Sequence, residues 1–147
     1  MPLAFRNVNA SQADPVATWP TEAVQAALER GDIEHWQRLT AEIVRDPWGR
    51  TANQLEEVLG HSRPYGVADL MEGVLDRARA RAALEERRTV AAEVRDAIAC
   101  SGLSRAEFAS RIGTSPSRLS TYATGKVVPS ATLMLRIRRV SRLVQPK

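Results

Sequence analysis

The segment 104–122, SRAEFASRIGTSPSRLSTY, constrains the fold most, because it contains helix-start and helix-stop signals in a fixed order. Ser104 can accept a hydrogen bond from a backbone N–H at the start of a first helix, and Glu107 completes a capping box. Gly113 can adopt the left-handed backbone that ends this helix. The segment therefore predicts a short helix and a tight turn, with one apolar helix face made of Phe108, Ala109 and Ile112.

A second helix is predicted directly after this turn. Ser115 can cap it, and Pro116 follows at the first helical position, where a missing N–H costs nothing. Leu119 and Tyr122, three residues apart, give the helix an apolar side. A short, basic and hydroxyl-rich helix behind a tight turn suits the major groove of DNA. The hydroxyl and basic side chains are Ser117, Arg118, Ser120 and Thr121.

The two halves of the chain differ strongly in charge. Residues 1–86 contain 9 Lys+Arg and 14 Asp+Glu, a net charge of −5, whereas residues 87–147 contain 12 and 3, a net charge of +9. No acidic residue follows Glu107. This division predicts one surface for a polyanion and another surface for something else. The alternative is that the basic residues only keep a small domain soluble.

Composition limits the class of protein. A chain of 147 residues is long enough for one domain or two small ones, and 44% hydrophobic with 5% aromatic residues implies a core of Leu, Val, Ile and Ala. No apolar run reaches membrane-spanning length, and the polar N-terminus lacks a signal region, so we expect a cytoplasmic protein without membrane attachment. The single cysteine excludes an internal disulfide.

The sequence gives little support for enzyme chemistry, and we expect no cofactor. Metal-binding and phosphate-binding motifs are absent from it. His35 and His61 are expected at helix edges or in loops, the alternative being a metal site that lacks further ligands. Cys100 follows an apolar helix face, which favours a buried thiol over a nucleophile.

Helical signals follow one another through the N-terminal half. Residues 1–18 have no periodicity and predict a loose arm. Thr21 is expected to cap a helix that Gly31 ends, Asp32 to cap a second helix and Thr51 a third. Breaks are expected at 46–49 and 62–66. The expected apolar stripes are Ile33, Trp36, Leu39, Ile43 and Val44; then Leu55, Val58 and Leu59; then Val67, Leu70, Met71, Val74, Leu75 and Ala78.

A long or once-broken helix is expected to link the halves, because residues 78–90 are rich in Ala, Arg and Glu. Thr89 is the expected restart position. A last helix capped by Ser130 follows a loop at 125–129. We thus predict an all-α fold, with a helical domain and linking helix over 19–88 and a helix-turn-helix domain over 89–147. The C-terminal stripes are Val90, Val94, Ala97 and Ile98, then Leu133, Ile137, Val140 and Val144.

Residues 89–144 resemble the Cro/phage-repressor-like helix-turn-helix family, often called the Xre family. The resemblance lies in Gly102-Leu103-Ser104, Glu107-Phe108-Ala109, Ile112-Gly113-Thr114-Ser115, Leu119-Ser120, Gly125-Lys126 and Pro129-Ser130, in that order and spacing. It implies a fold of four or five helices, binding to double-stranded DNA and action as a dimer.

By position, the resemblance makes residues 115–122 the recognition helix. It implies that Ser117 and Thr121 face base edges, with Ser120 between them, and that Arg118 reaches a guanine or a phosphate. Arg105 matches a position that touches the DNA backbone, and Lys126 matches a loop residue near phosphate. Two departures leave the DNA sequence that is read open: Pro116 replaces a base-reading side chain, and no acidic residue precedes Gly125-Lys126.

Residues 19–80 resemble the leading domain of some actinobacterial regulators that carry this helix-turn-helix. Proteins with this general domain arrangement include antitoxins of toxin–antitoxin pairs. The segments concerned are 19–23, 46–49 and 62–67. Trp19, Trp36, Trp48 and Tyr65 all lie in this half, either as core residues or as exposed anchors for a protein partner.

The expected function is sequence-specific transcriptional regulation, as a repressor that binds a palindromic operator as a homodimer. The alternative is an antitoxin that neutralises a toxin protein and autoregulates its operon. A third reading is an architectural DNA-binding protein.

Overall fold

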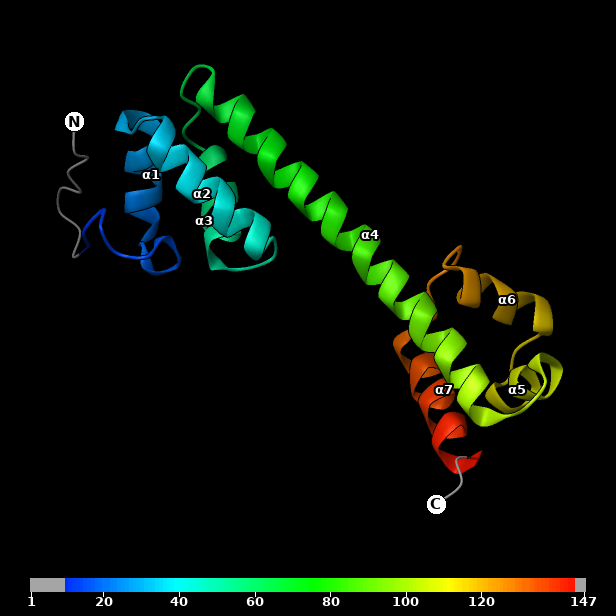
Figure 1. Ribbon diagram of the computed structural model, residues 1–147. Helices are drawn as coiled ribbons and strands as arrows, with labels where there is room; N and C mark the ends of the chain where they lie inside the picture. Colours follow the sequence, from blue (N-terminus) through cyan, green and yellow to red (C-terminus); the bar gives the residue numbers. More distant parts are fainter. Residues whose placement is uncertain (1–9, 145–147) are drawn as a thin grey trace. The chain divides into compact units, whose positions relative to one another are not determined.

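The computed structural model describes residues 10–144, without the side chain of Val144, and this part of the chain is all-helical (Figure 1). The chain divides into two compact units at Ala82–Ala83, a position inside the long helix α4. The elements are a 3₁₀ helix Val16–Thr18 and the α-helices α1 Thr21–Arg30, α2 Ile33–Arg45, α3 Arg50–Leu59, α4 Val67–Ser101, α5 Arg105–Ile112, α6 Pro116–Thr124 and α7 Ala131–Val144.

The N-terminal unit packs around Trp19, whose side chain is 0% exposed. Its indole Nε1 donates to the carbonyl of Asp14 at 3.1 Å, and its own carbonyl accepts from Gln54 Nε2 at 2.8 Å. The guanidinium of Arg38 lies 5.1 Å from the centre of the ring. The surrounding core is built from α1, α2, α3 and the first part of α4 and includes Val24, Leu28, Leu39, Ile43, Leu55, Val58, Met71 and Leu75.

Residues 10–18 are not the loose arm that the sequence predicted, whereas residues 1–9 lie outside the described part of the chain. Arg38 donates from Nη1 to the carbonyl of Gln12 at 2.6 Å and from Nη2 to that of Asp14 at 3.0 Å. Val16 is buried in the core. The sequence prediction failed because the partners of this segment lie on α2, which periodicity within the segment cannot detect.

Three helix N-caps were predicted in the N-terminal unit, and one of them is confirmed. Asp32 accepts hydrogen bonds from the backbone N–H groups of Glu34 and His35. Thr21 and Thr51 are instead inside their helices, because α1 begins directly after Pro20 and α3 directly after Gly49. Both preceding residues have extended backbone, and α1 starts one residue earlier than expected and α3 two residues earlier.

The predicted apolar stripes are buried except at their edges. Trp36 packs partly buried against the core, and Leu39 and Ile43 are fully buried. Ile33, Val44 and Leu70 are exposed, contrary to expectation. Ile33 is the first residue of α2, and Val44 and Leu70 are each next in sequence to a buried residue, about 100° around the helix from the core-facing side.

The linking helix is long and unbroken. Thr89 does not restart it, since its hydroxyl donates to the carbonyl of Glu85 at 2.9 Å within the helix. Threonine in this position bonds back to the previous turn and the helix continues.

The C-terminal unit packs α5, α6 and α7 with the last part of α4 around a second core. The buried residues are Val94, Ala97, Ile98, Phe108, Ala109, Ile112, Leu119, Ala123, Met134, Ile137 and Val140, with Val90, Leu103, Tyr122 and Leu133 partly buried. Cys100 is exposed, which corrects the predicted buried thiol. It lies two residues after Ile98, on the other side of the helix.

Replacing Trp19 with Ala should lower the free energy of unfolding of the N-terminal unit by about 3–5 kcal/mol, because it leaves a cavity at the centre of the core. All three tryptophans lie in this unit, so the fluorescence of the remaining two reports its urea unfolding. Trp48 is 53% exposed with Arg79 5.0 Å from its ring, so Trp48→Ala should cost only about 1 kcal/mol. Equal losses in the two variants would contradict the central role of Trp19.

Candidate nucleic-acid interface

The turn between α5 and α6 is fixed by hydrogen bonds at both helix ends. Ser104 Oγ accepts from the backbone N–H of Glu107 at 3.1 Å, and Ser115 Oγ accepts from that of Arg118 at 3.2 Å. Gly113 has φ +80°, the left-handed conformation predicted for it. Pro116 is the first residue of α6, also as predicted. Only the Ser104 half of the predicted capping box is present in the described structure.

The turn also satisfies the last carbonyls of α5. The N–H of Thr114 donates to the carbonyl of Ala109 at 2.9 Å, and that of Gly113 to Ser110 at 3.2 Å. This pattern needs the left-handed residue at Gly113, because only then does the chain fold back over the end of the helix. The direction in which α6 leaves the turn is therefore fixed by local backbone geometry.

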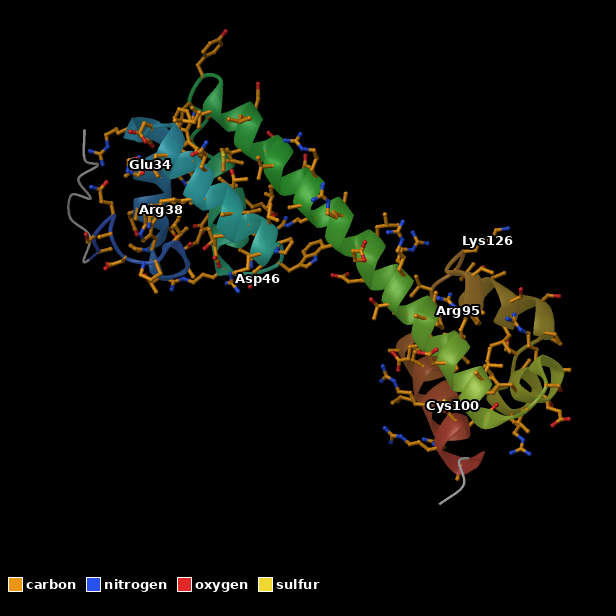
Figure 2. All side chains as sticks on the ribbon, in the orientation of Figure 1. Glu34, Arg38, Asp46, Arg95, Cys100 and Lys126 are labelled. Carbon is orange, nitrogen blue, oxygen red and sulfur yellow. The ribbon has the colours of Figure 1, made fainter. Side chains whose placement is uncertain are left out.

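The far end of α6 is attached to α4. Arg95 donates from Nη1 to the carbonyl of Ala123 at 2.6 Å, at the negative end of the α6 dipole. Gly125, with φ +81°, ends the helix, and a Cβ there would lie 3.4 Å from the Cβ of Ala91. Figure 2 labels Arg95 on α4 and Lys126 on the loop that follows α6. Sequence reasoning missed Arg95, because its partner is a backbone carbonyl that leaves no side-chain signal.

The outer surface of α6 is polar and solvent-accessible. Ser117, Ser120 and Thr121 share one helix side by their spacing of three and four residues. Thr121 is half-buried, and its hydroxyl donates to the carbonyl of Arg118 at 2.6 Å. Of the predicted site residues, the exposed ones are Arg105 at the start of α5, Ser115 at the N-cap of α6, Pro116, Ser117, Arg118 and Ser120 on α6, and Lys126 in the following loop.

The cations of this surface have no acidic partner among the described residues. Arg105, Arg118 and Lys126 form no ion pair there, unlike Arg138 on α7, which lies 2.6 Å from Glu93 Oε1. The hydrogen bond from Arg138 lowers the pKa of the Glu93 carboxyl and raises the pKa of the guanidinium. Positive charge is thus compensated on that part of α7 and uncompensated beside α6, which suits a polyanion at α6.

The two histidines, His35 and His61, differ in their surroundings. His35 is buried, with Nδ1 2.8 Å from Asp32 Oδ1 and Nε2 3.0 Å from Gln12 Oε1. His61 is exposed. In the described part of the chain, no group of three His, Cys, Asp or Glu side chains is placed to hold a metal ion.

A short helix with an exposed polar side, presented behind a tight turn by a four-helix unit, defines a helix-turn-helix DNA-binding domain. Residues 101–140 match the family model described as helix-turn-helix, and this confirms the Cro/phage-repressor-like resemblance for the C-terminal domain. The curated proteins contain no match to the chain, and neither do the solved structures. In residues 10–144, no helix combines the length and apolarity needed to span a bilayer.

Ser115→Ala should lower the stability of the C-terminal unit by about 1 kcal/mol, because the N–H of Arg118 loses its cap. Ser117→Ala, two residues later on the exposed side of α6, should leave stability unchanged. Urea unfolding followed by circular dichroism measures both, with tryptophan fluorescence reporting the N-terminal unit as an internal reference. Unchanged stability in Ser115→Ala would show that the cap contributes nothing.

Proposed function

We propose that the protein is a sequence-specific transcriptional regulator that represses by binding an operator as a homodimer. The observation that favours this most is the uncompensated cationic and hydroxyl surface of α6 and its flanks, on a domain matched as helix-turn-helix. Proteins of this kind gain affinity from phosphate contacts and specificity from base contacts.

The proposed roles of the surface residues combine the positions implied by the family resemblance with the chemistry of their side chains. Ser117, Ser120 and Thr121 are proposed to face base edges, with hydroxyl groups that can donate or accept. Pro116 offers an apolar contact, of the kind that a thymine methyl group accepts. Arg105 at the start of α5 and Lys126 in the loop after α6 are proposed to bind phosphates on either side.

The direct test of this function is selection of bound duplexes from a random DNA pool. An enriched palindromic sequence is expected, with half-sites about one helical turn apart, because a symmetric dimer places two recognition helices on one face of the duplex. A pool without enrichment would exclude sequence-specific regulation and favour an architectural role.

Arg118→Ala and Arg105→Ala should each weaken operator binding by about 1–3 kcal/mol. Arg118→Ala should also reduce the preference for operator over random duplex, whereas Arg105→Ala should weaken both alike. Binding titrations at several salt concentrations measure this, and the salt slope should fall by about 0.9 for each phosphate that is no longer bound. Unchanged affinity in both folded variants would refute the proposed interface.

The N-terminal unit is proposed to be the assembly or partner-binding domain. Its surface exposes Tyr65 completely, at 103%, and the nearby Leu70, while Trp48 is half exposed. Exposed aromatic side chains are typical anchors of protein interfaces. The same observation favours the second candidate function, an antitoxin whose N-terminal unit binds a toxin protein.

Sedimentation distinguishes the two uses of this unit. We expect the full chain to form dimers, and a fragment 83–147 with its own core to stay monomeric and to bind operator more weakly, since one module contacts one half-site. If the fragment dimerises and binds as tightly as the full chain, the N-terminal unit is not needed for assembly. The antitoxin function would then explain that unit better.

A further inference from the structure

A groove of about 360 Å³ lies inside the C-terminal unit, between α4 and the end of α6. Its lining consists of Leu84, Arg87, Arg88, Ala91 and Arg95 from α4, with Thr124 and Gly125 from the end of α6. Residues 84, 88, 91 and 95 follow one side of α4 at spacings of three and four. Arg87 and Arg88 precede the segment 101–140 matched as helix-turn-helix.

The position of the groove is set by packing. Gly125 lies against Ala91, and Arg95 is bound to the carbonyl of Ala123. Arg95 therefore attaches α6 to α4 and compensates the negative end of its dipole. The other two guanidinium groups of the groove belong to Arg87 and Arg88, and they take no part in attaching α6 to α4.

The groove has a cationic lining with no acidic side chain in it. Arg87 and Arg88 are both exposed. Arg88 has one acidic contact, Glu85 on the same helix at 3.1 Å between Nη1 and Oε1, and both side chains of this pair are about two thirds exposed. Exposed ion pairs of this kind contribute little and are easily exchanged for another anion.

Continuity with α6 indicates the occupant. Lys126, proposed above to bind phosphate, directly follows Gly125 in the groove wall. A duplex seated at α6 and Lys126 brings further phosphates to this edge of the unit, and arginine binds phosphate oxygens in bidentate fashion.

We propose that Arg87 and Arg88 bind phosphates of the DNA backbone beside the base pairs that α6 contacts. Helix α4 thereby extends the DNA-binding surface beyond the helix-turn-helix segment. This inference rests on the proposed function, because it requires a duplex at α6. The contacts are independent of sequence, since phosphates are the same at every step.

The experiment compares R87Q/R88Q with R139Q/R142Q in the full chain. The control pair removes the same charge from exposed positions on α7, which lies on the other side of α4 from α6 (Figure 1). In R87Q/R88Q, affinity for operator and for random duplex should fall together, roughly tenfold for each arginine that no longer binds a phosphate. The salt slope should fall by about 0.9 for each phosphate released. The control should retain most of its affinity.

Glu85→Gln gives a change of opposite sign. It removes the carboxylate that competes for Arg88, so binding to both duplexes should strengthen by a few fold. Ethylation interference on the wild-type complex should show phosphates outside the base pairs read by α6, and these signals should vanish in R87Q/R88Q. Circular dichroism checks that α4 stays helical in each variant.

The outcomes separate this inference from the function beneath it. If R118A weakens binding while R87Q/R88Q equals wild type, the regulator function stands and the α4 site is wrong. Equal losses in R87Q/R88Q and R139Q/R142Q would indicate bulk charge and also overturn it. A loss of operator preference in R87Q/R88Q would indicate base contact in place of phosphate contact. If the wild type binds no duplex DNA, the function and the inference fail together.

Discussion

The left-handed backbone of Gly113 is the constraint on which the proposed interface depends. It allows the N–H of Thr114 to reach the carbonyl of Ala109, which ends α5 and redirects the chain. Ser115 then caps the N-terminus of α6, so that only a few residues separate the two helices. A side chain with a Cβ would be strained at this φ, and α6 would leave the turn in another direction. The arrangement of hydroxyl groups and cations on α6 follows from this single turn.

Sequence reasoning succeeded where cause and effect lie within one helical turn. The caps at Asp32, Ser104 and Ser115 have partners two or three residues away, so their residue types suffice to predict them. It failed where the partner is distant in sequence, or where a nearby residue occupies the N-cap position in place of the expected one. The segment before Trp19 is ordered by Arg38 on another helix. Helices α1 and α3 begin directly after Pro20 and Gly49, whereas Thr21 and Thr51 had been expected to cap them. The surface position of Cys100 shows that an apolar neighbourhood in sequence does not specify the side of a helix.

The sequence indicated which residues belong to the candidate site better than it indicated the contacts that hold these residues in place. Local signals and the family resemblance pointed to the residues of α6, and the family match confirms the domain in which they lie. The positioning of α6 by Arg95, and the groove beside it, arise from contacts between residues about thirty positions apart, at 95 and 123. Such contacts appear only when packing brings two helices together. The charge difference between the halves could be read from the sequence. The structure adds that the cations of the basic half differ among themselves: Arg138 on α7 is paired with Glu93, whereas the cations near α6 are unpaired.

The unbroken course of α4 has a consequence for its own middle. Residues 84–89 are all exposed, so this stretch has no buried side chain to stabilise it and depends on helix propensity and on local contacts such as the exposed Glu85–Arg88 ion pair. Local opening of a helix needs the least free energy where burial is least. Backbone amides in this stretch should therefore exchange their hydrogens with solvent sooner than those of residues 71–78 and 94–98 of α4, which contribute buried side chains to the two cores. A helix that is continuous in its hydrogen bonds is in this way uneven in its stability, and its least stable turns contain Arg87 and Arg88, the residues proposed to bind phosphates.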